Sequence, residues 1–332
     1  MSELALYRKY RPKTFAEVVG QDEVLAVLEP ALRDQEPAHA YLFIGSRGTG
    51  KTSVARLVAA KLKTEPVDLY EIDAASNRGI DEIRALREAV KSLPFASPYK
   101  VYIIDEVHML TKEAFNALLK TLEEPPAHVI FILATTEIQR VPETIVSRCQ
   151  VLTFRPPTLE ILKKHLTRVS KAEGYAIEPA AVELVALAGD GSYRDALGAL
   201  QKAIAISPDK KIAADEVARV LGAPRRALVE QILAAVVSKD ASGVSEAVMA
   251  AESSGVDLRL VLGVLLTEVR LALRGVLAGK KDQLMPTLAA LEPKRLAEIL
   301  RLLLGAHDEV TRGPLPSLAL ELALLQLTGV NE

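Results

Sequence analysis

The sequence is poor in cysteine and in aromatic residues. It has one Cys and no Trp, and aromatic residues make up 4% of its 332 positions. A single cysteine excludes an intrachain disulfide and a cysteine-based metal cluster, which fits a reducing, cytoplasmic environment. Because 49% of the residues are nonetheless hydrophobic, the core must be built mainly from Leu, Val, Ile and Ala.

The sequence also lacks a strong charge of one sign and an uncharged apolar stretch. The formal net charge is -2, so no global field draws the chain to nucleic acid, although local basic patches remain compatible with that total. The most apolar stretch, residues 258–277, contains four charged residues: Arg259, Glu268, Arg270 and Arg274. The three arginines fall on one side at helical spacing. These charges argue against a membrane span and favour an amphipathic helix. The opening Met-Ser-Glu-Leu predicts no signal peptide.

A phosphate-binding pattern lies near the N-terminus. Residues 45–52 read Gly-Ser-Arg-Gly-Thr-Gly-Lys-Thr and match G-x-x-x-x-G-K-[ST], between an apolar run and a helical pattern. Backbone N–H groups of such a loop face phosphate oxygens, and the following helix adds its positive dipole end. We expect Lys51 to reach the β- and γ-phosphates of ATP and the Thr52 hydroxyl to ligate Mg²⁺. The predicted nucleotide-binding residues here are Gly45, Ser46, Arg47, Gly48, Thr49, Gly50, Lys51, Thr52 and Ser53.

Two acids end the hydrophobic run 101–104. In a P-loop ATPase, Asp105 would hold Mg²⁺ directly or through water, and Glu106 could activate an attacking water as general base. The pair therefore favours hydrolysis over passive nucleotide storage. Arg148 and Arg194 could each neutralise charge on the transferred phosphoryl group, but spacing alone does not distinguish them from surface arginines.

The first half of the chain alternates strand and helix patterns. With residues 41–44, the runs 67–72, 101–104, 129–134 and 151–154 read as buried strands, and the helical segments include 81–91 and 112–122. This alternation predicts a parallel five-stranded sheet with helices on both faces, and a ligand site at the carboxyl ends of the strands. From residue 158 onward we expect helices and no strand. Breaks at 155–157 and 222–224 predict three domains: an α/β nucleotide-binding domain (1–157) and two helical domains (158–222 and 223–332).

Taken together, these motifs resemble an AAA+ ATPase with a helical lid. The match becomes more specific in residues 6–15 and 18–21, which resemble the N-terminal box of clamp-loader subunits. The runs 114–126, 134–137 and 145–149 are similar to the gamma/tau family of bacterial DNA polymerase III. The resemblance covers most of residues 4–222 and continues more weakly to the end, where residues 318–325 resemble the closing helix of a collar domain.

The resemblance implies roles that spacing could not supply. Ser147-Arg148-Cys149 matches the motif that offers an arginine finger to the ATP of a neighbouring subunit, whereas Arg194 matches the lid arginine that acts in cis. Thr136, or Thr135, would be the first sensor. Residues that would line the adenine pocket are Tyr7, Arg8, Arg11, Pro12, Val18 and Val19. Arg78, in a loop that faces DNA in the family, is a candidate phosphate contact, although solvated surface charge explains it equally well.

The same resemblance implies a clamp-loader motor. ATP binding would order a spiral of subunits that opens the sliding clamp around primer-template DNA, and hydrolysis would release the clamp. The implied partners are delta, delta-prime, further copies of this chain, the clamp and DNA, with no membrane; residues 223–332 would form the oligomerisation collar. Residues 62–66 carry no cysteine where the family has a four-cysteine module, so we expect no zinc. The expected cofactors are ATP and Mg²⁺. The sequence stops after the collar, which makes polymerase tethering by a longer extension doubtful.

Three alternatives remain open from the sequence. The small subunit of archaeal-eukaryotic clamp loaders shares residues 10–14 and 147–149, although the run 119–126 favours the bacterial type. A non-hydrolysing structural subunit of the delta-prime type shares the Ser-Arg-Cys motif but typically has a degraded phosphate loop. A Holliday-junction branch-migration motor has less support, because no winged-helix pattern follows residue 222.

Overall fold

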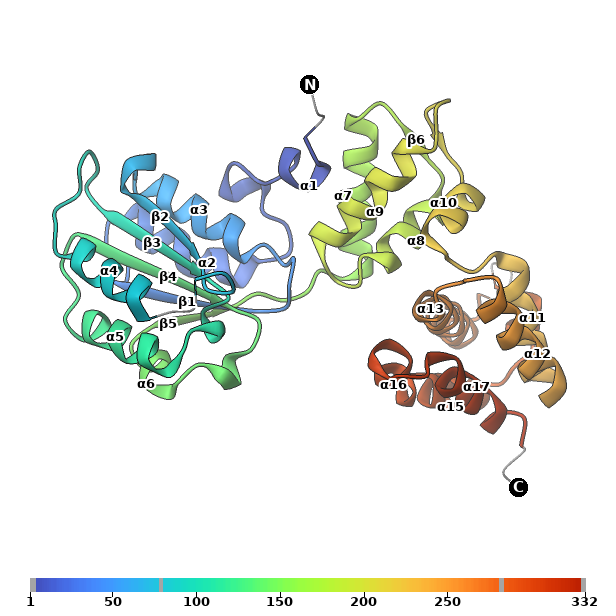
Figure 1. Ribbon diagram of the computed structural model, residues 1–332. Coiled ribbons are helices and arrows are strands. Elements are labelled where there is room, and N and C mark those ends of the chain that lie inside the picture. Colours follow the sequence, from blue (N-terminus) through green and yellow to red (C-terminus); the bar gives the residue numbers. More distant parts are fainter. Residues whose placement is uncertain (1–3, 78–79, 281–283, 330–332) are drawn as a thin grey trace. The chain divides into compact units, whose positions relative to one another are not determined.

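The computed structural model describes residues 4–77, 80–280 and 284–329 (Figure 1). These residues form two compact units. The first runs to Leu162 and also includes Gly191–Asp195; the second contains Lys163–Asp190 and the chain from Ala196 onward. The predicted domain boundary at residue 222 lies inside the second unit and stays a prediction.

The first unit is built on a five-stranded parallel sheet, as predicted. Its strand order is β2-β3-β4-β1-β5. The strands are β1 (Ala40–Ile44), β2 (Leu69–Asp73), β3 (Lys100–Asp105), β4 (Val129–Thr135) and β5 (Gln150–Thr153). The expectation that all five are buried is wrong for β2 and β5, which contain exposed residues. These two strands are the sheet edges, where only one side has a neighbouring strand.

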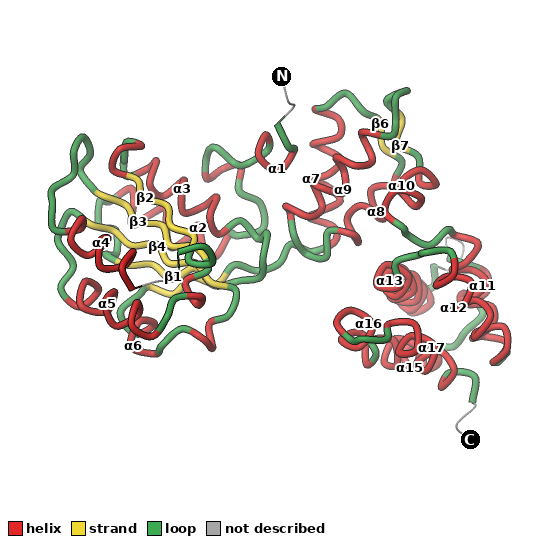
Figure 2. Tube along the Cα trace, viewed as in Figure 1, coloured by secondary structure: helices red, strands yellow, loops and turns green. Residues whose placement is uncertain are grey.

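Helices cover both faces of this sheet (Figures 1 and 2). Successive side chains of a strand point to opposite faces, so Tyr41 and Phe43 pack with α2 and α3, whereas Ala40 and Leu42 pack with α4 and α5. The bounds are α1 (Leu6–Lys9), α2 (Asp22–Arg33), α3 (Lys51–Lys61), α4 (Ile80–Val90), α5 (Lys112–Glu123) and α6 (Glu143–Val146). The Thr111 side chain caps α5 by accepting a hydrogen bond from the Ala114 N–H.

Strand β2 starts two residues later than the pattern predicts, because Pro66–Asp68 forms a 3₁₀ turn, η2. The buried Asp68 carboxylate accepts backbone N–H groups of Phe95, Ala96 and Ser97 at 2.7, 2.8 and 2.9 Å. Burial acts to raise the pKa of Asp68, but these hydrogen bonds outweigh it and lower the pKa below its ordinary value. Asp68 thereby ties the loop before β3 to the edge of the sheet.

The second unit is helical, but the expectation of no strand beyond residue 158 is wrong. The short strands β6 (Ala176–Ile177) and β7 (Lys211–Ile212) pair in parallel. The helices here are α7 (Leu159–Ala172), α8 (Pro179–Ala188), α9 (Tyr193–Ala205) and α10 (Ala214–Leu221). The first residues of α7 and α9 belong to the first unit. Two-residue strands are too short to give an alternating pattern in the sequence.

The remaining helices share one aliphatic core of Leu, Val, Ile and Ala, as the composition predicts. They are α11 (Arg226–Ser238), α12 (Ala241–Ser253), α13 (Leu258–Leu277), α14 (Pro286–Ala289), α15 (Pro293–Gly305), α16 (His307–Arg312) and α17 (Pro316–Gln326). Helix α13 is amphipathic, since Val261 and Leu265 are buried whereas Arg270 and Arg274 are exposed. Among the described residues, no helix is both long and apolar enough to cross a membrane.

Candidate nucleotide-binding site

The phosphate-binding loop joins the end of β1 to the start of α3, where the sequence predicts it. Gly48 and Gly50 have φ values of 75° and 106°, in the left-handed region that favours glycine. At Gly45 the limit is space, because a Cβ atom would lie 2.4 Å from the Phe154 carbonyl oxygen. Glycine is therefore required at all three positions for the loop to hold this backbone path.

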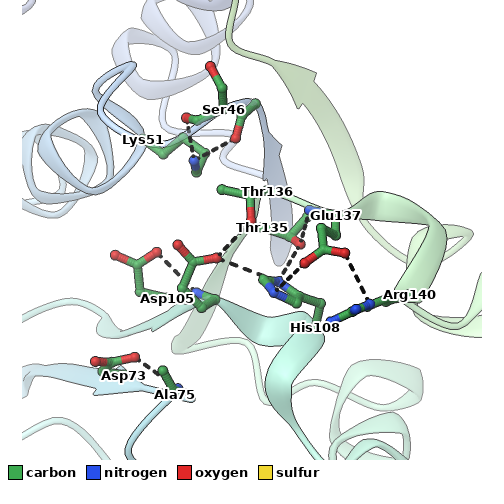
Figure 3. A network of polar contacts seen from close by, with 12 residues as sticks. Ser46, Lys51, Asp73, Ala75, Asp105, His108, Thr135, Thr136, Glu137 and Arg140 are labelled. Carbon is green, nitrogen blue, oxygen red and sulfur yellow. Dashed lines mark hydrogen bonds and ion pairs between the residues drawn. The ribbon is translucent and has the colours of Figure 1, made fainter. Parts of the chain in front are cut away.

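Lys51 lies folded over its own loop, with its side chain largely buried. Its Nζ donates to the carbonyl oxygens of Gly45 and Ser46 at 2.7 and 2.9 Å (Figure 3). Burial lowers the pKa of Lys51, while the Glu106 and Asp105 carboxylates act in the opposite direction. A buried ammonium group on a glycine loop is a group that can meet the charge of a polyphosphate.

Thr52, in the first turn of α3, meets Asp105 at the carboxyl end of β3. The Thr52 hydroxyl donates to Asp105 Oδ2 at 2.6 Å, and Asp105 Oδ1 accepts the backbone N–H of Glu106 at 3.1 Å. A hydroxyl and a carboxylate in contact beside a phosphate loop are hard oxygen ligands of the kind that Mg²⁺ prefers. The residues present therefore fit a magnesium ion that is shared with nucleotide phosphates.

Glu106 stands at a sharp turn of the chain. Its φ of 49° lies in the left-handed region, which is uncommon for a residue with a Cβ atom. Its Oε2 accepts a hydrogen bond from the Thr136 hydroxyl at 3.2 Å. Thr135 instead is fully buried, and its hydroxyl contacts His108 Nδ1 and accepts the Glu137 N–H. Of the two threonines that the sequence left open, Thr136 is thus the one in contact with the candidate base.

Three residues around the loop were not assigned a role from the sequence. The Tyr193 N–H donates to the Gly48 carbonyl at 3.0 Å, and its hydroxyl donates to the Val19 carbonyl at 2.8 Å. Burial, with a contribution from Asp22, raises the pKa of Tyr193 to about 12. Ser192 is buried against Gly48. Its neighbour Arg194 was the only signal in the sequence that this segment reaches the loop.

Gln21 is the third of these residues. Its amide Nε2 donates to the carbonyls of Thr49 and Arg155 at 3.3 and 2.8 Å, and its Oε1 accepts the Arg155 N–H at 3.1 Å. The side chain is 3% exposed, so these bonds satisfy a polar group that has little access to water. Gln21 therefore fastens the loop to the segment after β5. Its place in the N-terminal box was the available sequence signal.

Arg194 lies over the ring of Tyr7, with its guanidinium carbon 5.8 Å from the ring centroid. Arg8 approaches the same ring at 5.8 Å. Arg194 is also close enough to Lys51 to act on its pKa. The structure thus brings Tyr7 and Arg194 together beside the loop. Arg47 is exposed and Ser53 half-buried; the adenine-pocket roles of Tyr7, Arg8, Arg11, Pro12, Val18 and Val19 stay predictions.

Arg148 is paired within its own chain, at the segment after α6. Its Nη1 donates to the Thr144 carbonyl and its Nη2 to Glu123 Oε1, both at 2.8 Å. Its predicted action on a neighbouring subunit stays a prediction. Arg78, the candidate DNA contact, lies outside the described residues.

The segment between α3 and β2 contains the η2 turn, at the place where the sequence predicts no zinc module. Burial raises the pKa of the Cys149 thiol to about 12, so this cysteine is not activated as a thiolate ligand. Within the described part of the chain, no group of three or more His, Cys, Asp or Glu side chains is placed to hold a metal ion. The expected absence of zinc stays a prediction.

Family models of DNA polymerase III subunits match most of the chain. Three family models match consecutive parts of the chain. The model described as DNA polymerase III, delta subunit, matches residues 63–158. That of the DNA polymerase III clamp loader subunit, ATPase lid domain, matches residues 161–209, and that of DNA polymerase III subunits gamma and tau domain III matches residues 212–332.

Curated relatives carry related names. DNA polymerase III subunit tau of Bacillus subtilis (strain 168) is 38% identical over an alignment that covers 98% of this chain and 63% of the relative. The Escherichia coli (strain K12) subunit tau is 45% identical, with 67% of this chain and 38% of the relative covered. The chain thus spans between 38% and 63% of the length of these two relatives.

Solved structures support the fold. The Thermotoga maritima RuvB Holliday junction branch migration motor superposes with a TM-score of 0.55 over 69% of this chain and 79% of that chain. At 23% sequence identity this likeness shows the AAA+ fold alone. The chain belongs to the gamma/tau family of DNA polymerase III clamp-loader subunits.

Proposed function

We propose that this chain is the ATP-hydrolysing motor subunit of a DNA polymerase III clamp loader. The observation that carries the proposal is the contact of Thr52 with Asp105, beside the buried Lys51 and the acid Glu106. A chain that only stored nucleotide would need the loop, but it would not need a second acid positioned by a threonine. The intact loop and acid pair also disfavour a non-hydrolysing structural subunit.

The residues divide the work of phosphoryl transfer. Lys51 and the loop N–H groups bind the β- and γ-phosphates, and Arg194 acts on the same nucleotide in cis. Thr52 and Asp105 would hold Mg²⁺, which neutralises charge on the phosphates when bound. The Glu106 carboxylate, oriented by Thr136, accepts the proton of the attacking water. Arg148 of one copy stabilises the charge that develops at the site of its neighbour, so turnover requires assembly.

Hydrolysis is useful only if nucleotide changes the assembly. ATP can shift a spiral of subunits between two arrangements only through different affinities for them. A site completed by the neighbour's Arg148 supplies such a difference, because the assembled arrangement gains a contact with the nucleotide. The arrangement favoured by ATP would open the sliding clamp on primer-template DNA, and hydrolysis would remove that preference. The other members of the assembly are delta, delta-prime and further copies of this chain.

The test is to mix this chain with delta, delta-prime and clamp from the same genome and to measure ATP turnover with and without primer-template DNA. We expect turnover to rise when DNA is added. Lys51→Ala should abolish nucleotide binding, whereas Glu106→Gln should bind ATP normally and trap the ATP-bound assembly. Failure of the unaltered chain to bind ATP would instead support the delta-prime-like alternative.

A further inference from the structure

His108 is a buried imidazole held between two carboxylates. It lies in the turn η3 (Val107–Met109), directly after the acid pair, and its side chain is 5% exposed. Its Nδ1 is 2.9 Å from Thr135 Oγ1 and 3.5 Å from Glu106 Oε2, and its Nε2 is 3.4 Å from Glu137 Oε1 (Figure 3). Each ring nitrogen therefore lies beside a different acid: Nδ1 beside Glu106 and Nε2 beside Glu137.

The partners of the ring are themselves fixed. Thr135 ends β4, and its hydroxyl accepts the Glu137 N–H at 3.0 Å. Glu137 Oε2 forms an ion pair with Arg140 Nε at 3.0 Å, at the end of the turn η4 (Ile138–Arg140). The imidazole is thus held by groups from the end of β4 and the turn that follows it. Because contacts at both nitrogens hold the ring in place, the ring can in turn hold the Glu106 carboxylate that it contacts.

Glu106 depends on such neighbours for its direction. Its backbone is in the left-handed region and its side chain is 30% exposed, so packing alone does not fix the carboxylate. The polar contacts at its Oε2 come from the Thr136 hydroxyl at 3.2 Å and from His108. Lys51 and Thr52, which serve phosphate and Mg²⁺, are held instead by the loop carbonyls and by Asp105.

We propose that His108 is a positioning residue for Glu106: wedged between Glu106 and Glu137, it holds the base in the direction that activates water. The inference rests on the proposed function, because it assigns Glu106 its role as base. A general base works only within hydrogen-bond reach of the proton that it accepts, and a displacement of about 1 Å can lower a rate by roughly 100-fold. Loss of the imidazole should therefore affect turnover and spare ATP binding.

Two amide substitutions of His108 test the two ring nitrogens separately. His108→Asn places an amide near the former Nδ1, facing Glu106 and Thr135, whereas His108→Gln places it near the former Nε2, facing Glu137. In the assembled complex with DNA, we expect His108→Asn to keep kcat within about threefold. His108→Gln and His108→Ala should lower kcat by about 10- to 100-fold, with KM for ATP unchanged in all three. Thermal unfolding and ATP affinity of each variant serve as controls for the fold.

The outcomes separate this proposal from the one on which it rests. If the unaltered complex hydrolyses ATP and the Asn and Gln variants lose turnover equally, or neither loses any, His108 is a structural residue and the proposal is overturned. A larger loss for Asn than for Gln overturns it as well. If His108→Ala does not fold, the comparison of Asn with Gln still decides. Absence of turnover in the unaltered complex overturns the proposed function itself.

Discussion

The hydroxyl of Thr52 donates a 2.6 Å hydrogen bond to Oδ2 of Asp105. The two residues come from different elements, the first turn of α3 and the end of β3. The parallel sheet brings them together, because the carboxyl ends of its strands lie at one edge. With Lys51 bonded to the loop carbonyls and Glu106 following Asp105, this contact marks where phosphates and a divalent cation would meet.

Asp105→Asn tests the cation role directly. The amide keeps an oxygen that can accept the Thr52 hydroxyl, but it has no charge to offer Mg²⁺. Because a bound metal contributes several kcal/mol to such reactions, we expect turnover in the assembled complex to fall by at least about 100-fold. ATP affinity should be compared in Mg²⁺ and in EDTA: the gain from Mg²⁺ should shrink in the variant, with affinity in EDTA unchanged. An equal gain from Mg²⁺ in both proteins would contradict the assignment of Asp105.

The close approach of Gly48 to Ser192 gives a second prediction. A Cβ atom on Gly48 would lie 1.9 Å from Ser192 Oγ, and φ at Gly48 is 75°. Gly48→Ala should therefore lower both thermal stability and ATP affinity. The left-handed backbone alone costs about 1–2 kcal/mol, and the clash adds to that cost. Adding Ser192→Gly removes the clashing side chain, so the double variant should recover part of the loss.

Ser192→Gly alone is the matched control. It removes a hydroxyl that accepts the Asp195 N–H at 3.2 Å, and glycine in such a capping position costs only a few tenths of a kcal/mol. Thermal unfolding of all four proteins gives the coupling between the two positions. If the double variant is no more stable than Gly48→Ala, the contact between Gly48 and Ser192 does not limit this loop.

The sequence predicted the parts of the site that lie within single motifs. The loop 45–52 and the pair Asp105 and Glu106 are local patterns whose strand and helix context is visible along the chain. Gln21 and Tyr193 could not be placed in this way. Gln21 reaches Arg155, which lies 134 positions away, and Tyr193 reaches Val19 across 174 positions. Such contacts depend on how the elements pack, and no periodic pattern encodes them.

The fold shows the same limit. The central strands β1, β3 and β4 are long apolar runs and were predicted within about a residue or two. The edge strand β2 starts later than predicted, because Pro66 favours a turn there and Asp68 binds a loop from elsewhere in the chain. Thr135 and Thr136 could not be distinguished from sequence, because β4 ends at Thr135 and the pattern does not show which of the two hydroxyls reaches Glu106.

Asp68→Asn should destabilise the first unit. The charged carboxylate accepts hydrogen bonds from three backbone N–H groups. An amide has only one acceptor oxygen, and its NH2 group would place a donor against at least one of these N–H donors. We expect a loss of about 2 kcal/mol in the free energy of unfolding at pH 7. The pKa of Asp68 is lowered by folding, so its contribution is present above the unfolded pKa near 3.8 and is lost as pH falls through the folded pKa. The difference between the two proteins should therefore narrow below about pH 4.

Urea unfolding at several pH values measures this difference. Asp34→Asn is the control, because Asp34 is an exposed residue that pairs with its sequence neighbour Arg33. It should change stability little at any of these pH values. If the destabilisation by Asp68→Asn persists undiminished at low pH, the lost interaction does not depend on the charge of the carboxylate.

Arg148→Ala should leave ATP binding intact and remove hydrolysis in the assembled complex. In its own chain Arg148 bonds to the Thr144 carbonyl and to Glu123 at the surface, so its loss should disturb the fold little. An arginine that completes a phosphoryl-transfer site is worth about 1,000-fold or more in turnover. Arg33→Ala, which removes an exposed arginine far along the chain from Arg148, is the control and should keep full activity. ATP binding by the isolated chain and DNA-stimulated turnover by the complex are the two measurements.

A mixture of two inactive variants decides whether Arg148 acts across a subunit boundary. Lys51→Ala lacks a nucleotide site but keeps its arginine, whereas Arg148→Ala keeps the site and lacks the arginine. If the arginine acts in trans, an assembly containing both variants has some complete sites, where Arg148→Ala binds ATP and its Lys51→Ala neighbour supplies the guanidinium. Turnover should then return when the two are mixed, although each alone is inactive. If Arg148 acted on its own nucleotide, no mixture of the two would contain a complete site and none would recover activity.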